Sequence, residues 1–234
     1  MTAAQETHEV PATAPDNRAW FWPGFFIAWI FFALAYANRL DYIPGHFAFW
    51  ATIASTGFLI AAWTPNKEQR DPFSIWIFLG LICCCIGDLI GPFHFMTGAN
   101  AFFFAQTFFS IAAWKKGINW RWATPMIPVM IASNAALLWY TLPGTPDEEV
   151  IKVIAYSVII SIMVITAVGA CSNNVPLAWA GILFYVSDVF VALWRFGDSP
   201  ASGWICYPIY YSACLLFAYC VHVDRAGRVK DTYS

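Results

Sequence analysis

The sequence predicts an all-α membrane protein, a polytopic bundle of eight transmembrane helices. Of its 234 residues, 60% are hydrophobic and only 11% are charged, whereas soluble domains are about 25% charged. Apolar windows of the length that crosses a bilayer, roughly 17–25 residues, recur along the whole chain. Tryptophans gather at the ends of these windows, as in the aromatic belts of membrane proteins. The partners we expect are membrane lipids, and no basic stripe suggests nucleic acid.

Each predicted helix fills one apolar window between turn-rich segments such as "RLDYIPG", "TPNKEQRDP" and "LPGTPDEE". The fourth window is the shortest. Its boundary with the third is the weakest, because "GPFHFMTGAN" contains no charge and only Gly, Pro and Asn indicate a turn. The predicted helices span residues 19–37, 46–63, 73–93, 99–114, 121–142, 150–170, 177–195 and 204–222.

The two ends of the chain are predicted to be cytoplasmic tails. Residues 1–18 are polar, acidic and contain proline, without the apolar core of a signal peptide, so we expect a disordered tail there. Residues 19–222 are predicted to form the transmembrane domain, and residues 223–234 are predicted to form a second, short tail after it. Nine of the twelve Lys and Arg residues fall on the side of the termini, which favours a cytoplasmic position for both. These nine are Arg18, Lys67, Arg70, Lys115, Lys116, Arg121, Arg225, Arg228 and Lys230.

Two carboxylates lie inside predicted helices, where a charge at the bilayer centre costs at least about 2.5–3.5 kcal/mol. Asp88 follows three cysteines in "LICCCIGDLIGPF", and Asp188 lies in "FYVSDVFVALWRF". Their helices run in the same direction, and the two residues differ in depth by about 6 Å at 1.5 Å per residue. We expect both to face one polar cavity. The alternative is that each only hydrogen-bonds a neighbouring helix.

The remaining metal-ligating residues predict neither a metal nor a cofactor. Cys83, Cys84 and Cys85 point in three directions on a helix, so they are apolar filling rather than a joint ligand set. His46 and His94 lie near helix ends and are typical of the membrane interface, although with Asp88 they would offer metal ligands. No lysine occurs in the seventh or eighth window to carry a retinal Schiff base.

Two blocks of the sequence resemble the YhhN/lysoplasmalogenase family of eight-helix membrane proteins. The first is Gly87-Asp88, followed by "FMTG" and "AF"; the second is "GILFYVSDVFVALWRF", followed by "YPIYYSACLLFA". Tyr156 and Met163 fit the family's spacing on the sixth helix. The chain departs from the family at three places. Gln106 and Phe109 stand where the family usually has His and Tyr, and the Lys-Pro of the second helix is absent.

The resemblance implies hydrolysis of the vinyl-ether bond of lysoplasmalogen, a lysophospholipid, to a fatty aldehyde and a glycerophospho-ethanolamine or -choline. Protonation of the alkene carbon remote from the ether oxygen makes an oxocarbenium ion, to which water adds. This chemistry needs one protonated carboxyl and one carboxylate, as in glycoside hydrolysis. We expect Asp88, in the more apolar surroundings, to be the acid and Asp188 to be the base.

Six further residues are expected to bind the substrate or to orient these two carboxylates. The two tyrosines of the last helix would hydrogen-bond a carboxylate or water, and Gln106 would orient the head group or water in place of the family's His. Arg195 shares a helix face with Asp188 and would anchor the outer interface or steer a phosphate. The six are Gln106, Tyr156, Ser187, Arg195, Tyr210 and Tyr211.

Two other functions stay open at this point. A transporter or proton-coupled carrier would use the two aspartates as a relay. A lipid-binding relative without catalytic activity would explain the missing His and Lys. Neither the head-group preference nor the oligomeric state follows from the sequence.

Overall fold

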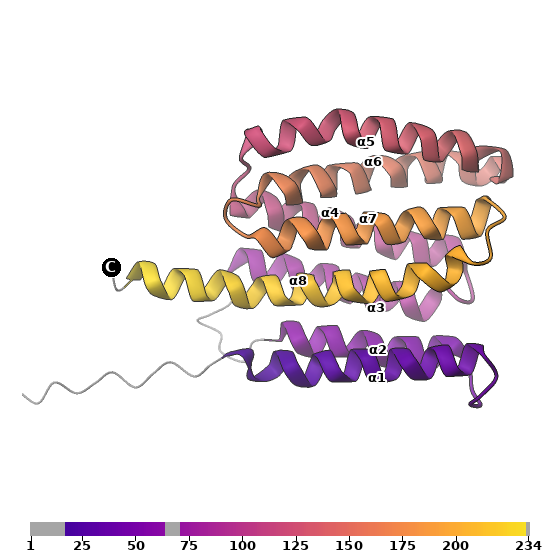
Figure 1. The fold of residues 1–234 in the computed structure, drawn as a ribbon, viewed down its shortest axis with the longest axis horizontal. Coiled ribbons are helices and arrows are strands. Elements are labelled where there is room, and N and C mark those ends of the chain that lie inside the picture. Colours follow the sequence, from indigo (N-terminus) through magenta and orange to yellow (C-terminus); the bar gives the residue numbers. More distant parts are fainter. Residues whose placement is uncertain (1–16, 64–70, 233–234) are drawn as a thin grey trace, which may run out of the picture.

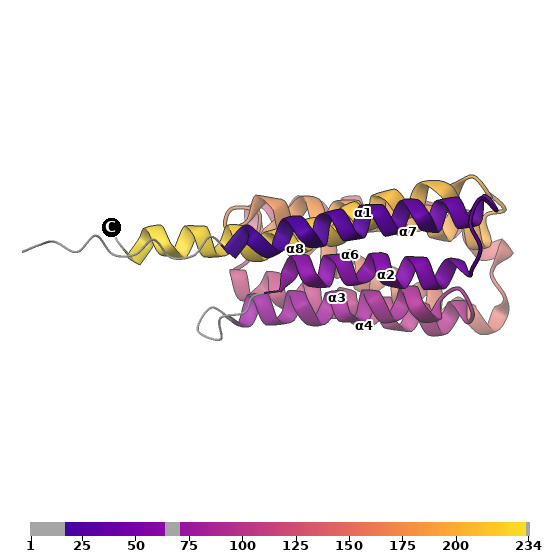
Figure 2. The same ribbon diagram turned by 90° about the horizontal axis from the view of Figure 1, so that it is seen from below.

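The computed structural model describes residues 17–63 and 71–232 as a bundle of α-helices that run alternately up and down (Figure 1). The start of α1 and the end of α8 therefore lie at the same end of the bundle, as a second view also shows (Figure 2). Short 3₁₀ segments precede α1 and follow α5. The α-helices are α1 (Phe21–Arg39), α2 (Phe47–Ala62), α3 (Pro72–Ile90), α4 (Phe95–Lys116), α5 (Trp120–Thr141), α6 (Asp147–Gly169), α7 (Val175–Phe196) and α8 (Ser202–Thr232).

Helices that are consecutive in sequence pack as antiparallel pairs. The α1–α2 pair forms one edge of the bundle and the α5–α6 pair forms the opposite edge (Figure 1). Between these edges lie α3, α4, α7 and α8, and α8 contacts α1, α2, α3 and α7. The helices that carry the two aspartates, α3 and α7, are therefore both neighbours of α8.

Close backbone packing joins α1 to α2. A Cβ atom on Gly24 would lie 2.3 Å from the backbone nitrogen of Ala61, and one on Gly57 would lie 2.4 Å from that of Ala28. Each helix thus presents a Gly and, four residues on, an Ala to its partner. Such pairs of small residues let membrane helices approach closely enough for extensive van der Waals contact.

The outer surface of the bundle is apolar, as expected of a protein whose solvent is lipid. Large hydrophobic side chains are exposed in the middle of most helices, for example Ile30, Phe104, Ile131 and Ile162, which a soluble monomer rarely tolerates over so wide an area. Among the described residues, six helices are long and apolar enough to cross a membrane: α1, α3, α5, α6, α7 and α8. The shorter α2 is also apolar, with 16 residues. The fold is that of a multi-pass, all-helical membrane protein.

Several predicted helix ends needed correction. The turn between α3 and α4 covers only residues 91–94, so α4 begins at Phe95 rather than at residue 99 and is as long as its neighbours. Pro92 has no backbone N–H to extend the hydrogen bonding of α3, which ends at Ile90 instead of residue 93. The eighth helix continues to Thr232, beyond the predicted end at residue 222.

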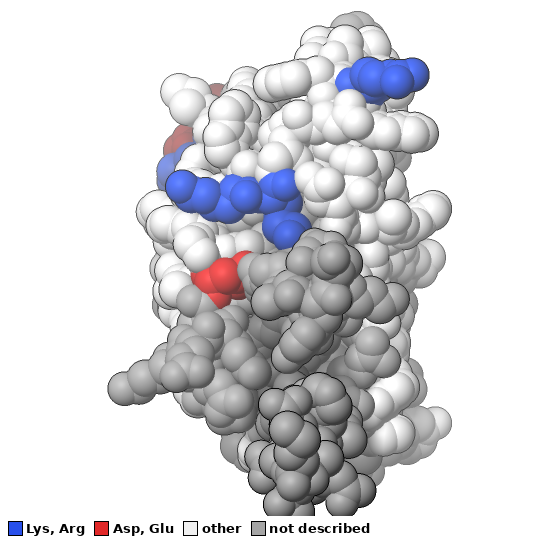
Figure 3. Space-filling view, turned by 90° about the vertical axis from the view of Figure 1, so that its left-hand side faces the viewer, with Lys and Arg blue, Asp and Glu red and all other residues white. Residues whose placement is uncertain are grey.

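The charged residues at the two ends of the bundle bear on its orientation. At the end where α4 finishes and α5 begins, the described cations are Lys115, Lys116 and Arg121, and the space-filling view shows a short band of Lys and Arg side chains with few acidic ones (Figure 3). The opposite end carries Arg39, Lys152 and Arg195. The predicted excess of Lys and Arg on the side of the termini depends on the remaining six cations. The cytoplasmic position of the termini therefore stays a prediction. The described part of the chain leaves out residues 1–16, Lys67 and Arg70, and it leaves out the side chains of Arg18, Arg225, Arg228 and Lys230.

Candidate active site

A cavity of about 510 Å³ lies in the half of the bundle where α3 and α7 end. Its volume is within the range of about 300–1,000 Å³ that is usual for small-molecule sites. Residues of seven helices, α2 to α8, line it, and most of them are apolar. Both Asp88 and Asp188 are among the lining residues. The two carboxylates therefore face one cavity, as predicted, but its wall is mostly apolar and not polar as expected.

Asp88 reaches the cavity from α3 and is almost fully buried, with 6% of its surface exposed. Its Oδ2 atom is hydrogen-bonded by the hydroxyl of Ser55 on α2 and, at 2.8 Å, by the hydroxyl of Tyr210 on α8. The neighbouring Tyr211 instead donates to the backbone carbonyl of Ala51 at 2.9 Å. Of the two predicted tyrosines, Tyr210 thus contacts the carboxylate and Tyr211 holds α8 against α2.

The position of Asp88 depends on the glycine that precedes it. A Cβ atom on Gly87 would lie 2.6 Å from the aromatic ring of Phe102 on α4, so this ring occupies the space that any side chain would need. The start of α3 is fixed by its N-cap, where the Asp71 side chain accepts a hydrogen bond from the backbone N–H of Ser74 at 3.0 Å. The contact between Gly87 and Phe102 sets how far along α4 the carboxylate of Asp88 lies.

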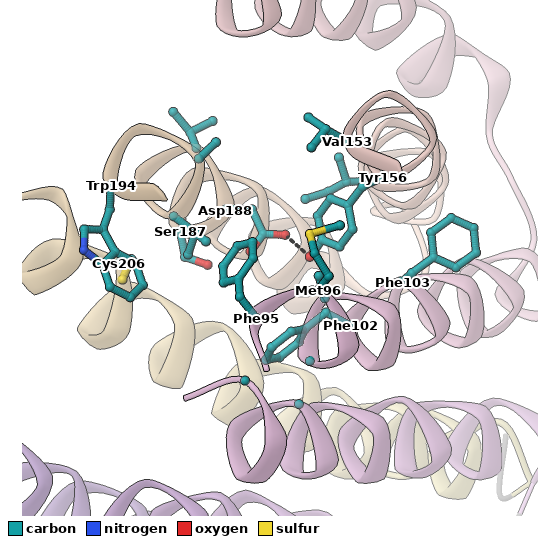
Figure 4. A pocket seen from close by; sticks show the side chains of 18 of the residues that line it. Phe95, Met96, Phe102, Phe103, Val153, Tyr156, Ser187, Asp188, Trp194 and Cys206 are labelled. Atoms are coloured by element: carbon teal, nitrogen blue, oxygen red, sulfur yellow. Dashed lines mark hydrogen bonds between the residues drawn. The ribbon is translucent and has the colours of Figure 1, made fainter. Parts of the chain in front are cut away.

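Asp188 reaches the same cavity from α7 and is half-buried. Its Oδ2 atom accepts hydrogen bonds from the Gln106 side-chain amide at 2.9 Å and from the Tyr156 hydroxyl at 2.8 Å. Figure 4 shows Tyr156 pointing toward Asp188, with Phe95 and Met96 beside them. The preceding residue, Ser187, also lines the cavity, and its hydroxyl donates to the Phe184 carbonyl at 2.9 Å.

Three of the predicted residues are not part of the cavity wall. Gln106 is fully buried behind Asp188, and its Oε1 atom has no hydrogen-bond partner within the described part of the chain. Tyr211 packs behind Tyr210. Arg195 is exposed, and its guanidinium lies 5.0 Å from the ring centre of Phe95, which itself lines the cavity. Arg195 is thus separated from the cavity by an aromatic ring.

The sequence reasoning missed two groups that the structure places at the site, Ser55 against Asp88 and Lys152 in the cavity wall. Ser55 gave no signal, because a serine in an apolar helix is also typical of close helix packing. Lys152 lies near the start of the sixth predicted helix, where a lysine is also typical of the membrane interface. Its spacing of four residues from Tyr156 would have identified it, because such residues share a helix face.

The site holds two carboxyl groups, each able to donate or accept a proton, in a cavity whose wall is mostly apolar. Within the described ranges, no group of three or more His, Cys, Asp and Glu side chains is arranged to hold a metal ion. Two carboxylates, each oriented by a tyrosine, suit acid–base chemistry on a largely apolar molecule.

Comparison with known proteins identifies the chain's relatives at the level of a family. A model of the YhhN family matches residues 46–221, which covers α2 to α8 up to Val221 and includes both aspartates. No curated protein matches the chain, and no solved structure matches it either.

Proposed function

The chain belongs to the YhhN family, and from that premise we propose that it is a membrane-embedded hydrolase that cleaves the vinyl-ether bond of lysoplasmalogens. The products are a fatty aldehyde and a glycerophospho-ethanolamine or -choline. The observation that carries the proposal is the pair Asp88 and Asp188 in one apolar cavity. A single-chain lipid fits such a cavity because its hydrocarbon tail needs an apolar wall and its ether needs a proton donor.

The proposed reaction uses both carboxyl groups and returns them to their starting states. Asp88 donates its proton to the alkene carbon that carries the hydrocarbon chain, and the carbon bonded to the ether oxygen becomes part of an oxocarbenium ion. Water adds to that carbon while Asp188 takes one of its protons, which gives a hemiacetal. In the collapse, Asp188 returns the proton to the glycerol oxygen as the carbon–oxygen bond breaks, and Asp88 takes the proton of the hemiacetal hydroxyl.

The hydrogen-bond donors around each carboxyl support this assignment of acid and base. Gln106 presents its amide N–H to Asp188, and an N–H can only donate, so the Asp188 oxygen is an acceptor and suits the ionised base. At Asp88 both donors are hydroxyl groups, from Ser55 and Tyr210, and both bond the Oδ2 atom. The Oδ1 atom receives no hydrogen bond from the described residues, so it is the oxygen that carries the proton of a neutral acid.

Aldehyde release from purified protein tests the proposal. Wild-type protein in detergent should release fatty aldehyde from lysoplasmalogen, and Asp88→Asn and Asp188→Asn should each lower the rate by at least about 100-fold, the usual contribution of a general acid or base. Asp198→Asn is the matched control, because Asp198 is exposed in a turn with a positive φ of 51°, which Asn tolerates. No aldehyde from the wild type, or full activity in both variants, would sink the proposal.

A second candidate is a lipid-binding relative without hydrolase activity. It is favoured by one observation, namely that Gln106 contacts Asp188 at the position where the resemblance leads us to expect His. In that case the protein retains lysoplasmalogen through size-exclusion chromatography but releases no aldehyde. The same purified samples therefore separate the two functions.

We further propose that all eight helices cross the membrane, with both termini in the cytoplasm. The alternating directions of α1 to α8 support this topology, because α2 and α4 run alongside the six helices that are long and apolar enough to span (Figures 1 and 2). In this orientation the cavity lies in the outer half of the membrane.

A further inference from the structure

Lys152 on α6 is a cation in the wall of the cavity that holds the two aspartates. Among the described residues that line this cavity, it is the one Lys or Arg. Its side chain is exposed, and it forms no ion pair with a carboxylate of the described part of the chain. A cation without an anionic partner, at the edge of an apolar cavity, is suited to bind an anionic group of a ligand.

The position of Lys152 relative to Tyr156 sets the distance of that anionic group from the reacting bond. The two residues are four positions apart, so they lie on one face of α6 and are separated along the helix axis by about 6 Å. Tyr156 donates to Asp188, the proposed base. Lys152 therefore lies about one helical turn from the proposed chemistry, toward the end of the bundle where α6 begins.

The same distance separates the ether oxygen from the phosphorus atom in a glycerophospholipid. Five covalent bonds join them, and at standard bond lengths they extend over about 6 Å. An ether positioned beside Asp188 and Tyr156 thus brings the phosphate to the level of Lys152. This end of α6 lies near the end of the bundle, where lipid head groups and the charged ends of lysine side chains meet in a membrane protein.

The geometry points to Lys152 as the residue that binds the phosphate of the lipid, which makes the site selective for phosphate-bearing ether lipids over alkenylglycerols. This inference rests on the proposed function for the identity of the lipid. It differs from the expectation that Arg195 steers a phosphate, because Arg195 lies behind the ring of Phe95.

The decisive comparison uses two substrates that share the vinyl ether and differ in the phosphate. In maltoside micelles, which contain no phosphate, Lys152→Ala should raise the KM for lysoplasmalogen about fivefold, the effect expected of one partly exposed ion pair, with little change in kcat. The KM for 1-alkenylglycerol should not change. Lys152→Arg should retain most of the affinity, and Lys115→Ala, at the opposite end of the bundle, is the matched control.

Several results would overturn the inference. One is an equal change in KM for both substrates in Lys152→Ala, and another is an unchanged KM for lysoplasmalogen in that variant. The third is a rise in KM for lysoplasmalogen, but not for 1-alkenylglycerol, in Arg195→Ala alone. If wild-type protein releases no aldehyde, the proposed function fails, and binding decides the inference by itself. Retention of a saturated 1-O-alkyl lysophospholipid and of 1-O-alkylglycerol through size exclusion is then quantified by mass spectrometry. If Lys152→Ala retains less of the lysophospholipid but as much of the alkylglycerol as the wild type, the inference is supported. Any other pattern contradicts it.

Discussion

Asp88 and Asp188 enter one cavity from α3 and α7, and each has its Oδ2 atom hydrogen-bonded by a tyrosine hydroxyl at 2.8 Å. Each Oδ2 has a second partner, Ser55 for Asp88 and Gln106 for Asp188. The Oδ1 atoms of both carboxyls receive no hydrogen bond from the described residues. One oxygen of each group is thus fixed by the protein, while the other remains for a substrate or water.

Tyr210→Phe should reduce the rate of aldehyde release by about 10- to 100-fold, because Asp88 becomes a carboxylate as it donates its proton and a hydrogen bond to a charged group contributes about 1.5–3 kcal/mol. Tyr210 directly contacts Asp88, whereas Tyr211 bonds the Ala51 carbonyl. Tyr211→Phe should therefore lower thermal stability and leave kcat within a few-fold of the wild type. Steady-state rates and melting curves of the two variants make the comparison. Equal losses of kcat in both would contradict the roles assigned to these tyrosines.

Gln106→Glu should reduce activity at least about tenfold, because it replaces an N–H donor beside Asp188 with a second acceptor. A like charge at that distance also opposes ionisation of the proposed base. Gln106→His keeps a ring N–H donor, and we expect activity within a few-fold of the wild type. Size-exclusion profiles of both variants check that this fully buried position still folds. Higher activity in the Glu variant than in the His variant would refute the donor role.

The fold and the two aspartates were predictable from the sequence for different reasons. Apolar windows locate the helices because the thickness of the bilayer sets the length of each window. The two aspartates were predicted to share a cavity because they lie at similar depths in helices that run in the same direction. The predicted start of α4 was wrong because the turn before it contains no charged residue that would indicate the helix boundary. The lateral neighbours of each carboxyl depend on helix packing, so a serine 33 residues before Asp88 could not be assigned to it.

Gly57→Ala should destabilise the protein, because its Cβ would lie 2.4 Å from the backbone of Ala28 and only a shift of α1 relieves the clash. Overpacking of this kind typically costs about 1–3 kcal/mol. Ala33→Leu, on an exposed position of α1, is the control and should leave stability unchanged. Thermal unfolding followed by size exclusion in detergent gives the measurement. An unchanged melting temperature for Gly57→Ala would show that the α1–α2 contact tolerates separation.

Cysteine labelling in intact cells should distinguish the two ends of the bundle. In a Cys171→Ser background, Ala201→Cys lies in the turn between α7 and α8, and Lys115→Cys lies at the end of α4; both positions are exposed. If both termini are cytoplasmic, a membrane-impermeant thiol reagent labels Ala201→Cys in intact cells and Lys115→Cys only after permeabilisation. The reverse pattern would invert the topology and place the cavity in the cytoplasmic half of the membrane. Labelling of both positions in intact cells would mean that an even number of helices spans the membrane between them, which contradicts the proposed crossing of α5, α6 and α7.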